Sequence, residues 1–244
     1  MKEEHFFYVP ETANLGVLPE DEVVHAVRVL RLREGDEIHL MDGRGSFFRA
    51  VITSLDKRRC EYEVKEQSVQ QPCWNGHIHL AIAPTKMNER MEWLAEKATE
   101  IGFDELSFLD CRYSERRVIK TERIERIVVA AMKQSRKAWK PQVNEMVAFE
   151  KFIMQPRAGR KYIAHCYEEV ERKYLYDELT KGVSSAQDEP LTVLIGPEGD
   201  FSLDEVRLAM DNGYESISLG NSRLRTETAG LAAVMMMQLV QSKS

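Results

Sequence analysis

The chain has 244 residues, of which 43% are hydrophobic and 30% charged, and its formal net charge is −6 at pH 7. This length suits one large domain or two smaller ones, and the composition is ordinary for a globular protein. The longest apolar stretch, Ala229–Met237, is too short to span a bilayer, and the start "MKEEHFFYVP" lacks the layout of a signal peptide. We therefore expect a soluble, cytoplasmic protein without a membrane partner.

The cysteines and the uneven charge narrow the class of protein further. Cys60, Cys73, Cys111 and Cys166 form no C-x-x-C pair, which predicts reduced thiols and no metal site. Between residues 112 and 140 there are ten Lys or Arg against three Glu, an excess of seven positive charges. A basic segment on an acidic protein indicates one specific anionic partner instead of general nucleic-acid binding.

The sequence pattern of the first 70 residues predicts a small β-barrel. Strand-like runs occur at "HFFYV", "DEIHLMDG", "SFFRAVITSL" and "CEYEVKEQ", with a hairpin turn at Asp42–Gly45. One short helix is expected from about Asp21 to Leu30. The polar stretch "QSVQQPCWNG" predicts a linker. We therefore expect a first domain over residues 1–70 and a second over residues 77–244.

After this linker, strand-like and helix-like segments alternate. Strands are predicted at "HIHLAIA", "LSFL", "YIAHC", "LTVLIG" and "ISLG". Asn88 and Thr121 are expected to cap two helices, and Gly102 is expected to end the first of them in the left-handed conformation. Two further helices are expected over residues 203–212 and 227–241. The alternation predicts an α/β fold with a parallel sheet covered on both faces.

One candidate ligand site is the turn in "LTVLIGPEGDFSLDEV". The apolar run Leu191–Ile195 predicts a strand buried on both faces, and Gly196-Pro197-Glu198-Gly199 predicts a tight turn with exposed backbone N–H and C=O groups. Ser202 and Glu205 fit a capping box at the next helix. Turns beyond the carboxyl ends of parallel strands commonly bind ligands, although this pattern is equally compatible with a plain connecting turn.

A second candidate loop lies in "SISLGNSRLRTETAGLAAVMMMQLV". Gly220-Asn221-Ser222 predicts a turn after a buried strand, and Thr226 is the expected cap of an almost wholly apolar helix. Arg223 and Arg225 lie at the helix start, where the helix dipole disfavours cations, so they favour a ligand over a plain solvated surface. We expect the two loops to lie side by side. They match neither a P-loop nor a Rossmann fingerprint.

Together, "LIGPEG" and "LGNSRLRTETA" resemble the SPOUT class of RNA methyltransferases. The runs "HAVRVLRLREGDEI", "PTKMNERMEWLAEKATEIG" and "MKQSRKAWKP" extend the resemblance across the chain. Within this class the chain is similar to the bacterial 16S ribosomal RNA uridine-N3 methyltransferase family. Two positions depart from the family pattern: Asp200 stands where glycine is usual, and Ser222-Arg223 stand where an arginine and then an aliphatic residue are usual.

The resemblance implies a fold, a cofactor and partners. The implied fold is a C-terminal SPOUT α/β-knot domain with a deep trefoil knot, preceded by a PUA-like β-barrel that binds RNA. The implied cofactor is S-adenosyl-L-methionine, and the implied partners are the 16S rRNA of the small ribosomal subunit and a second copy of the chain in a homodimer. Carried over to this sequence, the expected cofactor-binding residues are Leu194, Ile195, Gly196, Pro197, Glu198, Gly199, Ser218, Leu219, Gly220, Asn221, Leu224 and Arg225.

The implied reaction suggests catalytic candidates. Uracil N3 carries a proton, and the negative charge that develops on its removal spreads onto O2 and O4. Arg225 and Lys86 are candidates to stabilise this charge. Glu198 and Glu100 are weaker candidates, as acceptors of the proton. For Lys86 and Glu100, a solvated surface position is an open alternative.

Two roles are expected for other charged residues. Glu227 is expected to pair with Arg223 or Arg225 and fix its direction. Phosphates require clustered positive charge, which predicts an RNA surface. The residues expected on that surface are Arg28, Arg31, Arg112, Arg116, Arg117, Lys133, Gln134 and Arg136.

Two other functions remain compatible with the sequence. A non-enzymatic RNA-binding factor for ribosome assembly would keep the fold without needing both loops. A SPOUT ribose 2′-O-methyltransferase acting on another RNA would keep the loops, but the N-terminal barrel argues against it by analogy. Calorimetry with S-adenosylmethionine distinguishes the first alternative from an enzyme, because the absence of binding would favour the non-enzymatic factor.

Overall fold

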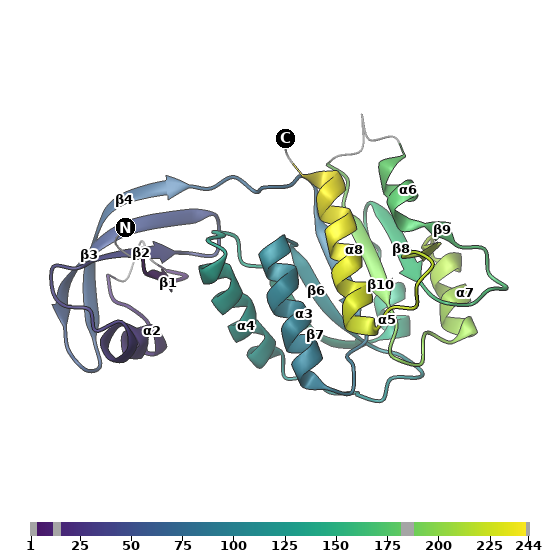
Figure 1. Ribbon diagram of the computed structural model, residues 1–244, viewed down its shortest axis with the longest axis horizontal. Coiled ribbons are helices and arrows are strands. Elements are labelled where there is room, and N and C mark those ends of the chain that lie inside the picture. The colour runs from purple at the N-terminus through teal and green to yellow at the C-terminus, as the bar shows by residue number, and fades with distance from the viewer. Residues whose placement is uncertain (1–3, 12–15, 182–187, 243–244) are drawn as a thin grey trace. The chain divides into compact units, whose positions relative to one another are not determined.

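The computed structural model describes residues 4–11, 16–181 and 188–242, and the chain forms two compact units (Figure 1). One unit contains the chain up to Pro72 together with Val129–Lys140, and the other contains Cys73–Val128 and the chain from Pro141 onward. Each unit has its own sheet and its own hydrophobic core. The domain limits expected from the sequence stay a prediction, and the grouping of Val129–Lys140 with the first unit was not expected.

In its described residues the first unit contains a four-stranded sheet and a short α-helix that continues into a π-helix. Its elements are β1 (Phe6–Tyr8), α2 (Glu20–Val24), the π-helix η1 (His25–Val29), β2 (Glu37–Met41), β3 (Ser46–Leu55) and β4 (Cys60–Val69). The strand order is β1-β2-β3-β4, with β1 parallel to β2 and the other pairs antiparallel. The Asp42 carboxylate accepts hydrogen bonds from the N–H groups of Arg44 (2.7 Å) and Ser46 (3.0 Å) and so fixes the predicted hairpin turn.

The Val129–Lys140 segment is held in the first unit by backbone and side-chain hydrogen bonds. The Ala138 N–H donates to the Gln70 side chain at 2.7 Å, and the Trp139 indole N–H donates to the Gln70 carbonyl at 2.8 Å. The Gly45 N–H donates to the Ala138 carbonyl at 2.9 Å. A segment expected to contact RNA therefore also has a structural role in the N-terminal unit.

The second unit is a seven-stranded sheet in the order β7-β6-β5-β10-β8-β11-β9. Every strand pair in it is parallel, as predicted. Its strands are β5 (Ile78–Ile82), β6 (Glu105–Asp110), β7 (Gln142–Ala148), β8 (Arg160–Ala164), β9 (Lys173–Tyr174), β10 (Leu191–Ile195) and β11 (Glu215–Ser218). Its helices are α3 (Asn88–Ile101), α4 (Thr121–Gln134, of which the second unit holds the part up to Val128), α5 (Phe149–Ile153), α6 (Leu175–Thr180), α7 (Leu203–Asp211) and α8 (Thr226–Gln241).

Helices cover both faces of this sheet. One core joins apolar residues of α3, α4, α6 and α8 to the sheet, and Figure 1 shows α3 and α8 side by side. A second core joins α5 and α7 to the opposite face. Every residue of β5 and β10 is buried, because each of these strands packs against helices on both sides.

Three predicted helix caps are wrong, whereas the predicted capping box before α7 is confirmed. Asn88 is already the first residue of α3, and the cap position before it makes no side-chain hydrogen bond. The Thr121 hydroxyl donates to Glu145 of β7. Thr226 is the first helical residue of α8, and Arg225 occupies the cap position. For Asn88 and Thr226 the helix begins one residue earlier than the capping rule suggested. For Thr121 a residue of another element accepts the hydroxyl hydrogen bond.

The end of the predicted linker is anchored to the second unit. The Trp74 side chain is buried, its indole N–H donates to Asp104 at 2.9 Å, and its ring lies against Gly102. Gly102 ends α3 with φ 122° and ψ 124°. Its φ is positive, as predicted, but ψ places it outside the left-handed helical conformation, since the chain turns at once toward β6.

Candidate active site

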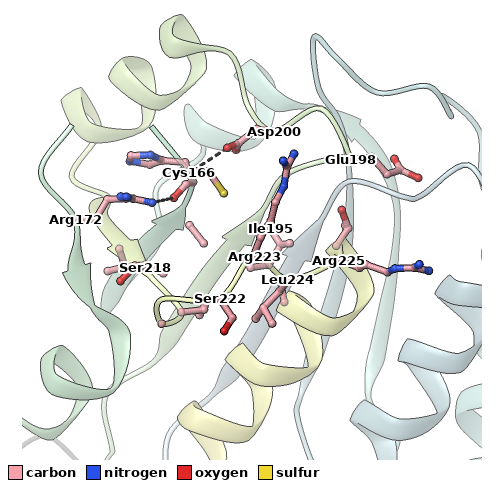
Figure 2. A pocket seen from close by; sticks show the side chains of 18 of the residues that line it. Cys166, Arg172, Ile195, Glu198, Asp200, Ser218, Ser222, Arg223, Leu224 and Arg225 are labelled. Carbon is pink, nitrogen blue, oxygen red and sulfur yellow. Dashed lines mark hydrogen bonds between the residues drawn. The ribbon is translucent and has the colours of Figure 1, made fainter. Parts of the chain in front are cut away.

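Three neighbouring strands of the parallel sheet end at the same edge. The order β10-β8-β11 places the loops that follow them next to one another. A cavity of about 940 Å³ lies among these loops, lined by residues within Ala164–Arg172, Ile195–Asp200 and Ile217–Ala229 and by Arg90 of α3 (Figure 2). The two glycine loops singled out in the sequence therefore do lie side by side. The volume is in the range of cofactor sites.

The loop after β10 is closed by its own backbone. The Asp200 N–H donates to the Pro197 carbonyl at 2.9 Å, which makes the tight turn that was predicted. The Glu198 carboxylate accepts the backbone N–H of Lys86 at 2.9 Å and so ties this turn to the segment after β5. The capping box of Ser202 and Glu205 then fixes the start of α7.

Asp200 has an unusual backbone conformation for a residue with a side chain. Its φ is 67°, in the left-handed region that favours glycine. Its carboxylate accepts the N–H of Phe201 at 2.7 Å and the N–H of Cys166 at 2.8 Å. These two bonds join the loop after β10 to the loop after β8, which offsets the strain of the backbone.

The loop after β11 leads directly into α8. The Glu227 carboxylate, in the first turn of α8, lies 3.4 Å from the Arg90 guanidinium of α3, and its side chain is only 10% exposed. The expected pairing of Glu227 with Arg223 or Arg225 is therefore wrong, because the adjacent helix α3 supplies the partner. The acidic side chain also suits the positive end of the helix dipole.

The loop after β8 was not identified from the sequence. His165 is buried, its ring shares a 2.8 Å hydrogen bond with Ser216, and its carbonyl accepts the Arg172 guanidinium at 3.0 Å. Burial lowers the pKa of His165, which favours the neutral form of the ring. Cys166 is exposed, and partial burial of its thiol, followed by the nearby Asp200 carboxylate, raises its pKa.

The predicted cofactor-binding residues line the cavity with one exception. Leu194 packs into the core with Phe201, because successive side chains of a strand point to opposite faces and Ile195 points the other way. The others lie along the cavity: Ile195, Gly196, Pro197, Glu198, Gly199, Ser218, Leu219, Gly220, Asn221, Leu224 and Arg225.

The catalytic candidates are not equally placed. Figure 2 shows Arg225 and Glu198 on the side of the cavity opposite Cys166 and Arg172. Lys86 does not line the cavity: its side chain is 74% exposed and its ammonium group lies 3.1 Å from Glu115.

Glu100, the other candidate for proton acceptor, does not line the cavity either. Its carboxylate pairs with Lys97 at 2.9 Å on α3. This geometry favours the open alternative of a surface charge on that helix.

Of the three predicted RNA-contact residues of the second unit, two hold neighbouring parts of the chain. The Arg116 guanidinium donates to the backbone carbonyls of Thr85 and Lys86, and Arg117 pairs with Asp110 at 2.5 Å. The Arg112 guanidinium is exposed, with the Asp204 carboxylate 3.9 Å away. The first two arginines therefore hold the chain between β6 and α4, and contact with phosphates stays a prediction.

Most of the predicted RNA-contact residues of the first unit are exposed, but one of them is bound within the fold. Lys133 pairs with the buried Glu22 at 2.6 Å, which gives this lysine a structural role in the fold. The Arg136 guanidinium lies 5.3 Å from the centre of the Phe6 ring and pairs with Glu4 at 2.9 Å. The exposed members of the set are Arg28, Arg31, Gln134 and Arg136.

Residues 4–11, 16–181 and 188–242 contain neither a candidate metal site nor a candidate membrane span. In these ranges no group of three His, Cys, Asp or Glu side chains is arranged to hold a metal ion. No helix there has the length and apolarity needed to cross a membrane.

Family models match both parts of the chain. The model of an RNA methyltransferase domain matches residues 72–238, and the model of an RNA methyltransferase PUA domain matches residues 18–65. The chain therefore belongs to the RNA methyltransferase family.

Within this family, curated relatives bear one name. The chain is 30% identical over 227 residues to ribosomal RNA small subunit methyltransferase E of Rickettsia conorii, which covers 92% of this chain and 90% of the relative. It is 31% identical over 241 residues to the protein of the same name from Mycobacterium bovis, which covers 93% of this chain and 88% of the relative.

Solved structures agree with this grouping. A protein of Porphyromonas gingivalis described as a probable rRNA-methyltransferase is 44% identical, with a TM-score of 0.86 over 97% of this chain and 98% of that one. A Legionella pneumophila protein described as a methyltransferase, solved with its cofactor SAM, is 26% identical, with a TM-score of 0.87 over 99% and 100%. Ribosomal RNA small subunit methyltransferase E of Neisseria gonorrhoeae, bound to S-adenosyl methionine, is 27% identical, with a TM-score of 0.78 over 98% of each chain.

Proposed function

We propose that this chain is an S-adenosylmethionine-dependent methyltransferase that methylates N3 of a uridine in the 16S rRNA of the small ribosomal subunit. The observation that carries the proposal is the cavity among the loops after β8, β10 and β11, in a chain of the RNA methyltransferase family. Relatives named for small-subunit rRNA methylation span most of its length, and two similar structures contain the cofactor.

The residues of the cavity fit such a cofactor. The backbone of Gly196–Gly199 and of Leu219–Asn221 offers N–H and C=O groups to a purine and a ribose, and Ile195, Ile217 and Leu224 offer apolar surface. Charged side chains of both signs line the same space, which suits a ligand with an amino-acid end. S-adenosylmethionine, when bound, supplies an activated methyl group on a sulfonium ion.

The chain's own residues then act on the uracil. We assign Arg225 to the negative charge that develops on O2 and O4 as N3 loses its proton, because this arginine lies at the edge of the cavity. Glu198 is the proposed proton acceptor, since only one of its carboxylate oxygens accepts the Lys86 N–H. The Lys86 ammonium would have to leave Glu115 to take part, which makes it a secondary candidate.

The expected domain roles and assembly are proposed with the same reaction. Residues 1–70 would bind RNA and residues 77–244 would carry the methyl transfer, within a knotted C-terminal domain of a cytoplasmic enzyme. A homodimer is supported by exposed apolar side chains on two adjacent helices, Trp93 of α3 and Met235 and Leu239 of α8. Light scattering of the purified protein at several concentrations tests the dimer.

Mass spectrometry of rRNA nucleosides tests the reaction. Small-subunit rRNA from cells that lack the gene should contain one 3-methyluridine fewer per subunit than rRNA from parent cells, and the purified protein should restore it. Unchanged 3-methyluridine in the mutant, or a new loss of a 2′-O-methylated nucleoside instead, would overturn the assigned substrate atom.

A further inference from the structure

The cavity contains an acidic and a basic side chain that face each other from different loops. Asp200 ends the turn after β10, and Arg223 lies in the loop after β11. Figure 2 shows both side chains reaching into the space between the two loops, with the Arg223 guanidinium toward Asp200. Cys166 lies near both, since the Asp200 carboxylate raises the pKa of its thiol and the Arg223 guanidinium lowers it, although burial has the largest effect.

The arginines at the cavity differ in what their guanidinium groups bind and in where they point. Arg90 pairs with Glu227, and Arg172 donates to the His165 carbonyl. Arg225 points to the opposite side of the cavity (Figure 2). Arg223 is exposed, and within the part of the chain that the structure describes it makes no hydrogen bond or ion pair. Its donors are therefore available to a ligand.

Asp200 keeps acceptor capacity toward the cavity. Each of its carboxylate oxygens accepts one backbone N–H, from Phe201 and from Cys166. A carboxylate has about four lone-pair sites, so roughly half of them remain for another donor. The two backbone bonds also hold the carboxylate in place before a ligand arrives.

We propose that Arg223 and Asp200 form the subsite for the amino-acid end of the cofactor. The Arg223 guanidinium binds the α-carboxylate, and the Asp200 carboxylate binds the α-ammonium group. A zwitterion needs one partner of each charge, and these two side chains supply that pair at the boundary of the two loops. The inference rests on the proposed function, because it places S-adenosylmethionine in this cavity.

Calorimetry with two thioethers tests the subsite. S-adenosylhomocysteine carries the amino-acid end, whereas 5′-methylthioadenosine lacks it. Arg223→Ala should weaken S-adenosylhomocysteine binding about 10- to 100-fold and leave 5′-methylthioadenosine binding within about twofold. Arg223→Lys should recover part of the loss, because the charge remains while the planar fork is lost. Arg207→Ala, at an exposed position of α7 outside the cavity, is the matched control and should bind both compounds as the parent chain does.

Each other outcome overturns the inference. Equal weakening of both thioethers would give Arg223 a general structural role. Unchanged binding of both, combined with weaker binding of an rRNA fragment, would make Arg223 a phosphate contact. If the parent chain bound neither thioether, the proposed function would fail as well. If the parent chain bound both and only the prediction for the Arg223 variants failed, the proposed function would stand.

Discussion

At the edge where the strands of the seven-stranded sheet begin, polar side chains bind one another, whereas at the edge where they end, polar groups surround a cavity. At the beginning edge, the buried His79 hydrogen-bonds to Ser107 at 2.8 Å, and Asn144 donates to Ser107 at 2.8 Å and to Glu105 at 2.6 Å. His77 hydrogen-bonds to Glu105 at 2.9 Å. At the ending edge, the loops after β8, β10 and β11 leave a space of about 940 Å³.

The comparison shows that a cluster of titratable residues does not by itself mark a ligand site. The His and Glu side chains of the beginning edge use their donors and acceptors on each other, so they stabilise the fold. The ending edge leaves backbone groups and the Arg223 side chain available, so it can bind a ligand. Variants at the two edges should therefore fail in different assays.

The largest effect is expected at the ending edge. Arg225→Ala should slow methyl transfer at least about 100-fold, roughly 3 kcal/mol in the barrier, because charge developing on the uracil loses its donor. Single-turnover assays with small-subunit rRNA measure this rate. The unfolding midpoint should stay within about 2 °C of the parent, and Arg207→Ala serves as the control. An Arg225→Ala protein with parental rate and parental cofactor affinity would remove Arg225 from the mechanism.

Alanine variants of two glycines, Gly102 and Gly220, should affect stability and ligand binding differently, although both glycines have the same φ of 122°. A Cβ at Gly102, at the beginning edge, would lie 2.5 Å from the Trp74 ring, whereas a Cβ at Gly220 in the cavity loop would meet nothing within 4 Å. Both Ala variants carry backbone strain of about 1 kcal/mol, and only Gly102→Ala adds a steric clash of roughly 1–2 kcal/mol. Urea unfolding measures the difference.

In a binding assay, Gly220→Ala should have the larger effect of these two variants. Gly220→Ala should weaken S-adenosylhomocysteine binding, because the strained loop lines the cavity, whereas Gly102→Ala should bind it as the parent chain does. Equal stability of the two variants would show that the Trp74 contact is unimportant to the fold.

The histidine network predicts a fall in stability on acidification. Burial lowers the pKa of His79 to about 4, below its usual 6.5, so the unfolded chain takes up more protons as the pH falls from 6.5 to 4. Stability should drop by roughly 2 kcal/mol between pH 7 and pH 5 from this group. Glu105, whose pKa its hydrogen bond with His77 lowers to about 2, adds a further loss below pH 4.5.

Two neighbours of His79 act on this pH dependence. The pKa of His77 is raised by its hydrogen bond to Glu105, so His77 stabilises the fold below pH 6.5 and offsets part of the loss. The Arg157 guanidinium further lowers the pKa of His79. His79→Gln should flatten the slope between pH 7 and pH 5 in urea titrations, whereas His25→Gln, at an exposed position of η1, should keep it. An unchanged slope in His79→Gln would assign the pH dependence to other groups.

The smallest effect concerns the reactivity of the two exposed cysteines, Cys166 in the cavity and Cys73 outside it. Because the pKa of the Cys166 thiol is raised, its alkylation should be slow at pH 7 and accelerate at higher pH. S-adenosylhomocysteine at about ten times its Kd should slow alkylation of Cys166 roughly tenfold and leave Cys73 unaffected. Peptide mass spectrometry measures both sites in one sample. Equal protection of both thiols, or of neither, would separate Cys166 from the ligand site.

The parts of the fold that the sequence predicted are those with local signals. β5 and β10 are mostly apolar runs, each with one polar residue, and α3 and α8 are long. β7, α5, β9 and α6 were missed. The seven residues of β7 alternate weakly, and the two residues of β9 form a strand only because β11 lies beside them. Pairing of this kind is not encoded in periodicity.

In the candidate site too, the features with local sequence signals could be predicted, and those that depend on tertiary packing could not. The turns at Gly196–Gly199 and Gly220–Ser222 carry local turn chemistry and could be identified. The contribution of the loop after β8 depends on the sheet order, in which β8 lies between β10 and β11. The pairing of Glu227 with Arg90 depends on the packing of α8 against α3. Neither arrangement leaves a trace in sequence spacing.

Amide hydrogen exchange with and without S-adenosylhomocysteine tests most directly whether the ending edge of the sheet is the cofactor site. We expect slower exchange within Ile195–Asp200 and Ser218–Arg225 on addition of the ligand, with no change at Ile78–His79 and Glu105–Ser107. Protection confined to the beginning edge, or the absence of any protection in the two loops at saturating ligand, would contradict it.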